Sequence, residues 1–180
     1  MAAERQAPDA ILVQTNLTGA VTDIDEDPDS PDGNWLTTPG GDTPIVLRNS
    51  FGTPTGNPTA GAGLQEFKAW VRRTNNSATR IPTMTFEVYD DGSLHATIET
   101  DVDVNSTSGE MHSGTWDASG LSSADGSTVE LRIVGTRSGG PAAQRNNVEI
   151  GAVEWNVDYA EVGGLGIPLV MHHRKQMAGN

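Results

Sequence analysis

Apolar and polar residues alternate over most of residues 10–160, and turn dipeptides interrupt the alternation at short intervals. The clearest example surrounds Asp91-Gly92, a dipeptide typical of two-residue hairpin turns. Before the turn, Met84, Phe86 and Val88 alternate with polar neighbours. After it, one face carries Leu94, Ala96, Ile98, Val102 and Val104, and the other carries His95, Thr97, Glu99, Asp101 and Asp103. This period of two predicts an antiparallel hairpin with one apolar face, and we expect His95 and His112 to face solvent.

The same pattern predicts about eight or nine strands along the chain. They cover roughly residues 10–15, 44–51, 64–73, 82–90, 93–104, 108–116, 127–137 and 147–160, with a weaker one at 34–38. A change of phase at Gly151-Ala152 predicts a β-bulge in the last strand. Long antiparallel strands without helical periodicity favour an all-β fold, an antiparallel, jelly-roll-like β-sandwich. A seven-stranded immunoglobulin-like sandwich is the second choice, weakened by the strand count and by the absence of Cys.

The length of 180 residues suits one domain with flexible ends. We expect an N-terminal arm over residues 1–9, the sandwich over residues 10–160 and a C-terminal tail over residues 161–180. The tail holds the only basic cluster of the chain, and no acidic residue follows Glu161. Its apolar and basic residues predict an anchor to another subunit, formed by Leu165, Ile167, Leu169, Val170, Met171, Arg174 and Lys175.

The charge excludes several classes of function. With 24 acidic and 11 basic residues, the net charge of −13 repels phosphate backbones, which argues against nucleic-acid binding. No apolar run is long enough to span a membrane. The N-terminal residues lack the apolar core of a signal peptide, so we expect synthesis in a cytoplasm.

An acidic stretch over residues 23–32 is the most unusual local feature. Asp23, Asp25, Asp27 and Asp29 alternate along it, and alternate carboxylates of an extended loop can converge on a hard cation. One interpretation is therefore a structural Ca²⁺ site, with no other cofactor. The alternative is a solvated acidic loop held extended by Pro28 and Pro31.

Trp70 is the aromatic residue with the strongest functional signal. Phe67, Ala69 and Val71 share the apolar phase, so Trp70 shares the other face with Lys68 and Arg72. These three residues predict a platform for a sugar ring or a subunit interface. The alternative is that the two cationic side chains simply cover the indole. Of the other tryptophans, we expect Trp116 and Trp155 in the core or at a sheet edge, and Trp35 as a plug at one end of the sandwich.

Motifs of enzymes are missing. The chain has no Gly-x-Ser-x-Gly, no His-Glu-x-x-His and no phosphate-binding glycine loop. Carboxylate pairs such as Asp101 and Asp103 are expected by chance among 24 acidic residues. The sequence therefore predicts a protein that is not an enzyme.

Three stretches together resemble a group of tailed-bacteriophage virion proteins. They are Asn16–Leu36, with its Asp-Ile-Asp-Glu-Asp-Pro-Asp-Ser-Pro-Asp run, Gly61–Phe67 (Gly-Ala-Gly-Leu-Gln-Glu-Phe) and Asn147–Asn156 (Asn-Val-Glu-Ile-Gly-Ala-Val-Glu-Trp-Asn). The resemblance covers about residues 10–158. It implies a β-sandwich or jelly-roll component of the virion, either a capsid decoration (cement) protein or a module of a tail or fibre.

These observations favour a non-enzymatic structural virion protein that decorates the capsid surface and bridges major capsid subunits. We expect it to be made in the host cytoplasm and to bind the major capsid protein or other virion subunits, as a homo-oligomer on the particle. The alternative function is a carbohydrate-binding module of a phage tail or fibre. A glycan-degrading enzyme is the third and least supported function.

Overall fold

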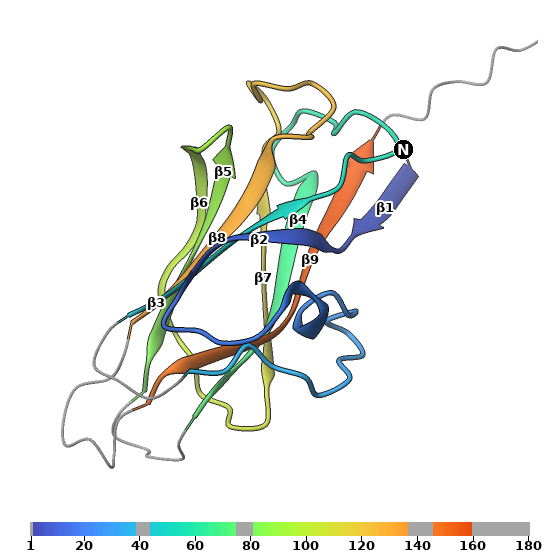
Figure 1. The fold of residues 1–180 in the computed structure, drawn as a ribbon. Helices are drawn as coiled ribbons and strands as arrows, with labels where there is room; N and C mark the ends of the chain where they lie inside the picture. Colours follow the sequence, from blue (N-terminus) through green and yellow to red (C-terminus); the bar gives the residue numbers. More distant parts are fainter. Residues whose placement is uncertain (1, 39–43, 75–80, 137–145, 160–180) are drawn as a thin grey trace, which may run out of the picture.

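In the computed structural model, the chain forms two antiparallel sheets packed face to face, a β-sandwich of the jelly-roll type (Figure 1). The structure describes residues 2–38, 44–74, 81–136 and 146–159. Sheet A has four strands in the order β1-β9-β4-β7, and sheet B has five in the order β2-β3-β8-β5-β6. The described residues contain a single helix, the 3-10 turn η1 (Val21–Asp23), and no helix among them is long and apolar enough to cross a membrane.

The strand bounds agree with the predicted ranges to within a few residues. The strands of sheet A are β1 (Ala2–Gln6), β9 (Val148–Tyr159), β4 (Gln65–Arg73) and β7 (Glu110–Trp116). Those of sheet B are β2 (Pro8–Thr15), β3 (Ile45–Phe51), β8 (Val129–Thr136), β5 (Thr83–Asp90) and β6 (Ser93–Asp103). The predicted all-β sandwich is therefore confirmed. The weak strand expected at 34–38 is reduced to isolated bridges at Leu36 and Thr37.

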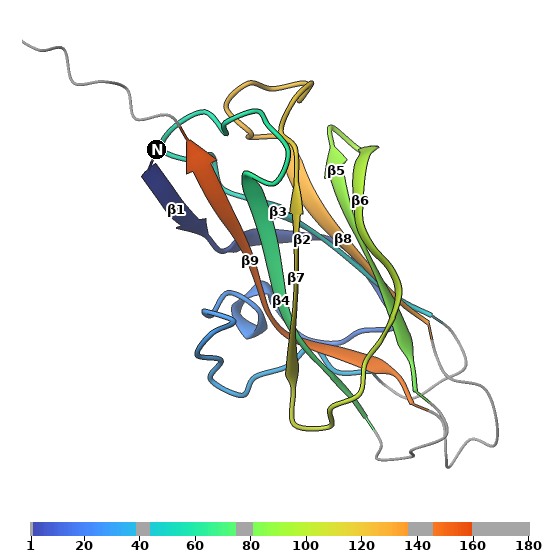
Figure 2. The same ribbon diagram turned by 180° about the vertical axis from the view of Figure 1, so that it is seen from behind.

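The N-terminal residues differ from the expected arm. Residues 2–6 form β1 at the edge of sheet A, where Ala2 pairs with Tyr159 and Gln6 with Trp155. The chain then crosses to sheet B, where β2 pairs with β3 (Figure 2). Because β1 is short and polar, its strand character comes from its partner β9 and not from a periodic pattern of its own.

Turns and bulges fix the register of both sheets. Asp91 and Gly92 have φ angles of 47° and 77°, as the two central residues of a type I′ hairpin require. The predicted bulge in β9 is confirmed, since Trp70 pairs with Ala152 and Val71 with Ile150, which leaves Gly151 unpaired. The predicted alternation of β6 is wrong in part, because three register shifts against β5 change which side chains point inward.

The core lies between the sheets and is centred on four aromatic rings. Phe67 stacks on Trp116 at 5.7 Å and lies 5.2 Å from Phe51, and Trp155 contacts all three rings at 5.8–5.9 Å. The buried amide of Gln65 lies beside them, accepts a hydrogen bond from the Trp155 Nε1–H at 3.2 Å and donates to the carbonyls of Thr59 and Asp158. Such pairing offsets the cost of burying a polar group.

Candidate functional site

The outer face of sheet A is partly covered by residues 16–38, which we call the covering segment. Residues 148–155 of β9 are buried on both faces, including Glu149 at 7% and Glu154 at 3% exposure. One face packs against sheet B and the other lies under the covering segment. Leu36 and Ile150 exchange two backbone hydrogen bonds, and the Val153 N–H donates to the carbonyl of Ile24 at 3.0 Å. The predicted loop is thus anchored to the sheet by buried residues, Ile24 and Leu36 above all.

Three cationic side chains of sheet A hold the covering segment in place. Arg5 pairs with Glu154 and donates from Nη2 to the carbonyl of Asp25 at 3.2 Å. Lys68 pairs with Asp29, with 2.8 Å between Nζ and Oδ2. Arg72 pairs with Glu149 at 2.8 Å and lies 4.1 Å above the ring of Trp35.

Trp35 therefore does not plug an end of the sandwich. Its ring packs against Gly151, where an added Cβ would lie 2.9 Å from the indole, and the guanidinium of Arg72 stacks on it. The indole fastens the covering segment to β9 and β4, and the bulge at Gly151 provides the room for it.

The structure does not bring the four predicted calcium ligands together. The Oδ2 of Asp23 accepts a hydrogen bond from the N–H of Ala20, and the Oδ1 of Asp27 accepts one from the N–H of Asp29. The carboxylate of Asp29 binds Lys68, and Asp25 is exposed. No cluster of three or more His, Asp or Glu side chains with the spacing of a metal site occurs within the described ranges.

Glu26 is the one carboxyl group of this stretch with a clearly shifted pKa. Its side chain is half-buried, and burial raises its pKa above the ordinary value of 4.5. A hydrogen bond to Asp32 and the negative charges of Asp32 and Asp25 raise the pKa further, against the lowering effect of the backbone. The acidic stretch therefore repels itself at neutral pH.

Trp70 lies at the border between the covered and the open part of sheet A. It points to the outer face with Lys68 and Arg72, between Ala152 of β9 and Met111 of β7. Gly109 lies against the indole, because an added Cβ there would be 2.4 Å from the ring.

The open part of this face continues onto β7. Ser113 pairs with Lys68 and Thr115 with Glu66, so their side chains point outward too. We call Lys68, Trp70, Met111, Ser113 and Thr115 the Trp70 strip. It offers an aromatic surface, an ammonium group and two hydroxyl groups, beside the exposed carboxylate of Asp29. This set of groups is suited to recognition by stacking and hydrogen bonding.

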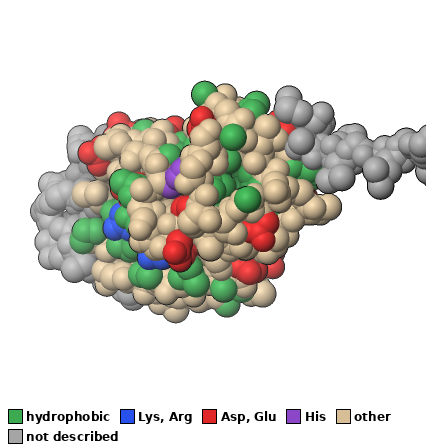
Figure 3. Space-filling model, turned by 90° about the horizontal axis from the view of Figure 1, so that it is seen from above, with side chains coloured by type: hydrophobic (Ala, Val, Ile, Leu, Met, Phe, Trp, Pro, Cys, Tyr) green, Lys and Arg blue, Asp and Glu red, His purple; other side chains and the backbone are tan. Residues whose placement is uncertain are grey.

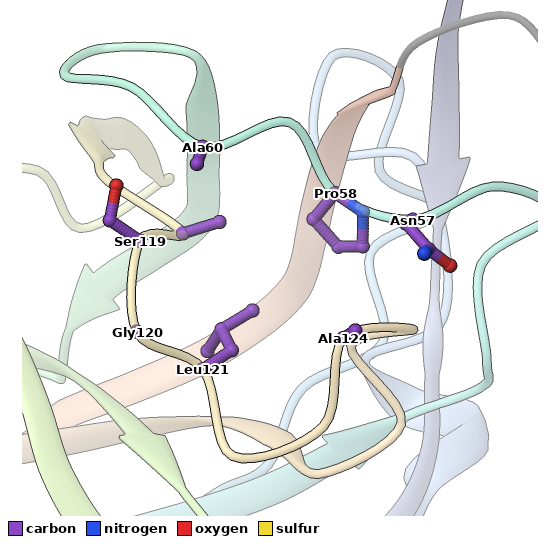
Figure 4. A pocket seen from close by; sticks show the side chains of 8 residues that line it. Asn57, Pro58, Ala60, Ser119, Gly120, Leu121 and Ala124 are labelled. Atoms are coloured by element: carbon purple, nitrogen blue, oxygen red, sulfur yellow. The ribbon is translucent and has the colours of Figure 1, made fainter.

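A second candidate site is a hollow at one end of the sandwich. It has a volume of about 280 Å³ and lies between the loop over residues 57–60 and the loop over residues 118–124 (Figure 4). Pro58, Ala60, Ala118 and Leu121 give it an apolar lining, and Asn57 lies at its side. The hydroxyl of Ser119 donates to Asp117, so it is already engaged.

Three carboxylates make the loop over residues 117–128 rigid. Asp117 accepts hydrogen bonds from the side chain and N–H of Ser119 and from the N–H of Gly61, which lower its pKa. Hydrogen bonds from Ser123 and Ser127 lower the pKa of Asp125 to about 2.

The third carboxylate, Asp90, anchors this loop to the end of β5. Burial opposes its ionisation, but hydrogen bonds from Thr128 and Ser122 outweigh burial and lower its pKa. The loop is therefore best ordered when all three groups are ionised.

Neither histidine of β6 and β7 faces solvent as we expected. The side chain of His112 is 14% exposed and lies between Glu99 at 3.4 Å and Glu110 at 3.3 Å. His95 contacts the ring of Trp116 edge-on at 5.7 Å and hydrogen-bonds to the carbonyl of Asp117. His95 and Glu99 are turned inward by the register shifts of β6, whereas His112 points inward because it pairs with the buried Ala69 of β4.

The predicted anchor in the C-terminal tail lies outside the described residues. It comprises Leu165, Ile167, Leu169, Val170, Met171, Arg174 and Lys175. The sequence also left Met111, Ser113 and Thr115 unassigned. Their alternation predicts a shared face, but only the pairing of β7 with β4 shows that Trp70 belongs to the same face.

No protein-family model and no curated protein matches the chain. Among solved structures, the C-terminal CBM6 of LamC, a marine laminarinase from Zobellia galactanivorans, matches 87% of this chain and 100% of its own at 10% identity, with a TM-score of 0.44. A family 35 carbohydrate-binding module from an environmental isolate matches 87% of this chain and 98% of its own length at 16% identity, with a TM-score of 0.35. A chain of Broad Bean Stain Virus matches 70% of this chain and 72% of its own length at 11% identity, with a TM-score of 0.33. At these scores, no ligand or activity of these proteins is transferred to this chain.

Proposed function

We propose that this chain is a non-catalytic β-sandwich module that binds carbohydrate on the Trp70 strip. The observation that carries the proposal is the position of Trp70, a half-buried indole on the open outer face of sheet A. Its immediate neighbours supply the ammonium of Lys68 and the hydroxyl of Ser113. An aromatic ring stacks on the apolar C–H face of a sugar, and polar groups around it bind the hydroxyls.

The contacts of the indole favour a preformed site. Gly109 packs against one edge of the ring, because a Cβ at this position would lie 2.4 Å from the indole. A ring that is fixed before the ligand arrives loses little side-chain entropy on binding. The pair of Lys68 with the exposed carboxylate of Asp29 is weak enough to open for a ligand hydroxyl.

A glycan array followed by calorimetry with the best glycan tests the proposal. We expect Trp70→Ala to abolish binding and Trp70→Phe to retain part of it. Leu94→Ala, on the other sheet, is the matched control and should bind as the wild type does. If no glycan binds, or if Trp70→Ala binds as tightly as the wild type, the proposal is wrong.

A second candidate is the virion decoration protein suggested by the sequence resemblance. The three resembling stretches are far apart in the sequence, yet they meet at β9. The stretch 16–36 pairs with β9 through Leu36 and Ile150, and Phe67 of the second stretch pairs with Trp155 of the third. This contiguity favours a shared structural unit over three chance similarities.

Mass spectrometry of purified particles, from phages that encode chains with these stretches, tests this second function. A decoration protein should be present at hundreds of copies. Deleting residues 163–180 should leave the sandwich folded and lower its occupancy on the particle, if the tail is the anchor. Full occupancy of the truncated protein would contradict the anchor, and absence from the particles would contradict the function itself.

A further inference from the structure

The exposed large hydrophobic residues of the described chain lie on the two edge strands of sheet B. Leu12 and Val13 on β2 are 47% and 38% exposed, and Leu94 on β6 is 54% exposed. These two strands are the opposite edges of sheet B. Val13 pairs with Arg48 and Leu94 with Tyr89, so both side chains lie on the outer face.

Between these margins lies a row of balanced charges. Arg48 pairs with Glu130, and Arg132 pairs with Glu87. All four side chains point outward, Arg48 from β3, Glu130 and Arg132 from β8, and Glu87 from β5. Arg48 lies opposite Arg132 on the neighbouring strand, and Arg132 lies opposite Glu87. The centre of the face therefore carries equal numbers of the two signs, while the exposed carboxylates of Asp9 and Asp103 lie on its edge strands β2 and β6.

Tyr89 lies at the centre of this row. The guanidinium groups of Arg48 and Arg132 are 5.3 Å and 5.7 Å from the centre of its ring. Tyr and Arg are enriched at the energetic centres of protein interfaces, and apolar contacts commonly surround them. Val46 and Val134 add half-buried apolar groups on the same face.

The charge of the whole chain restricts which surface two copies can share. Each copy has a net charge of −13, so most approaches bring like charges together. The centre of the outer face of sheet B is an exception, because its two Arg and two Glu balance, and a two-fold axis can place the Arg of one copy opposite the Glu of the other. Viewed from the end that carries the 117–128 loop, Lys and Arg side chains show on one flank, beside acidic and hydrophobic ones (Figure 3).

The size of the face is sufficient for a specific but modest interface. Five strands about 4.8 Å apart, with eight residues of about 3.3 Å each, span roughly 600 Å². Two such faces bury about 1,200 Å² in total, the lower end of the range for specific complexes.

We propose that the outer face of sheet B is an interface between two copies of this chain, packed face to face across a two-fold axis. Tyr89, Arg48 and Arg132 form its centre, and Val13 and Leu94 form its margins. This dimer goes beyond the proposed carbohydrate binding and does not depend on it. It leaves both Trp70 strips on the outside, on opposite sides of the assembly.

Sedimentation equilibrium of the full chain over a wide concentration range tests the interface. The wild type should approach twice the monomer mass of 19.0 kDa as its concentration rises. Leu94→Asp and Val13→Asp add charge at exposed positions and should each raise the dissociation constant about tenfold or more. Thr115→Asp, an exposed position on the outer face of sheet A, is the matched control and should change the dissociation constant less than about twofold.

Two results would overturn the interface. One is a wild type that stays monomeric up to about 1 mM, a concentration at which an association of only about 4 kcal/mol is half complete. The other is a dimer that Leu94→Asp and Val13→Asp leave intact while Thr115→Asp weakens it. Far-ultraviolet circular dichroism of each variant confirms that the sandwich is still folded.

Discussion

The outer faces of the two sheets differ in what covers them. Sheet A is partly covered by its own chain, and the covering segment buries β9 on both faces, including the side chains of Glu149 and Glu154. Sheet B has exposed Leu12, Val13 and Leu94 at its margins and balanced ion pairs at its centre. One face is therefore covered by its own chain, whereas the other leaves apolar and charged groups exposed, and it is the face for which we propose a second copy as partner.

The contacts of the cationic side chains on the two faces differ in the same way, since Arg5, Lys68 and Arg72 of sheet A all contact the covering segment. On sheet A, Lys68 reaches Asp29 of the covering segment, so the pair links a strand to a loop. On sheet B, Arg48 and Glu130 belong to neighbouring strands and stay within the sheet. The cations of sheet A therefore serve tertiary structure, while those of sheet B remain at a surface available to a partner.

The largest expected effect comes from a matched pair of leucines. Leu36→Ala removes a fully buried side chain under the covering segment and should lower the free energy of unfolding by about 2–5 kcal/mol. Leu94→Ala makes the same change at an exposed position of sheet B and should cost about 0.5 kcal/mol or less. Urea unfolding at low protein concentration measures both. Equal costs would show that the covering segment is not part of the cooperative fold.

Two glycine-to-alanine substitutions test whether the turn at Gly109 holds the indole of the Trp70 strip. Gly109→Ala should cost about 1–3 kcal/mol, because its φ of 119° suits glycine alone and the new Cβ clashes with Trp70. Gly120→Ala has a φ of 83° and open space around it, so we expect only about 1 kcal/mol of backbone strain. Tryptophan fluorescence should shift for Gly109→Ala alone. An unchanged spectrum would mean that the indole is not held by the 106–109 turn.

Two carboxyl groups should give stability changes of opposite sign with pH. The pKa of Glu26 is raised, so its ionisation costs stability as pH rises above 4.5 through the folded-state pKa. Glu26→Gln should therefore stabilise the protein at pH 7, by less than about 1 kcal/mol, and have little effect below pH 4.5.

Asp125 provides the opposite case. Its pKa is lowered to about 2, so its contribution to stability is present above the ordinary value of 3.8 and is lost as pH falls towards about 2. Asp125→Asn should therefore destabilise the protein at pH 7, and the difference should vanish at the acidic end. Melting temperatures from pH 2 to pH 8 measure both variants, and slopes of the same sign would contradict the assigned environments.

The smallest effect concerns the single ion pair between Lys68 and Asp29. Because the Asp29 side chain is 65% exposed, a double-mutant cycle with Lys68→Met and Asp29→Asn should give a coupling of about 0.2–1 kcal/mol that falls with salt. The pair of Arg48 with Glu130 is less exposed and should couple more strongly. A larger coupling for Lys68 and Asp29 would mean that the acidic stretch is held more firmly than its exposure indicates.

Much of the fold could be predicted from the sequence, because its determinants are local. The hairpin at Asp91-Gly92 and the bulge at Gly151 follow from turn chemistry and from a change of phase, and the structure confirms both. The alternation in β4 correctly placed Trp70 on the same face as Lys68 and Arg72. Prediction failed in β6, where register shifts turned His95 and Glu99 inward, and at β1, whose strand character depends on β9.

By itself, the sequence determined which segments are extended and where they turn, since side-chain alternation and turn residues act between near neighbours. Only the tertiary structure decided what the polar faces contact. Lys68 forms an ion pair with Asp29, which is 39 residues away in the sequence, and Arg72 forms one with Glu149, which is 77 residues away. The acidic stretch and the Trp70 platform looked like two independent sites in the sequence, but they meet on sheet A. Such pairings depend on how strands are ordered in a sheet, and no local pattern encodes that order.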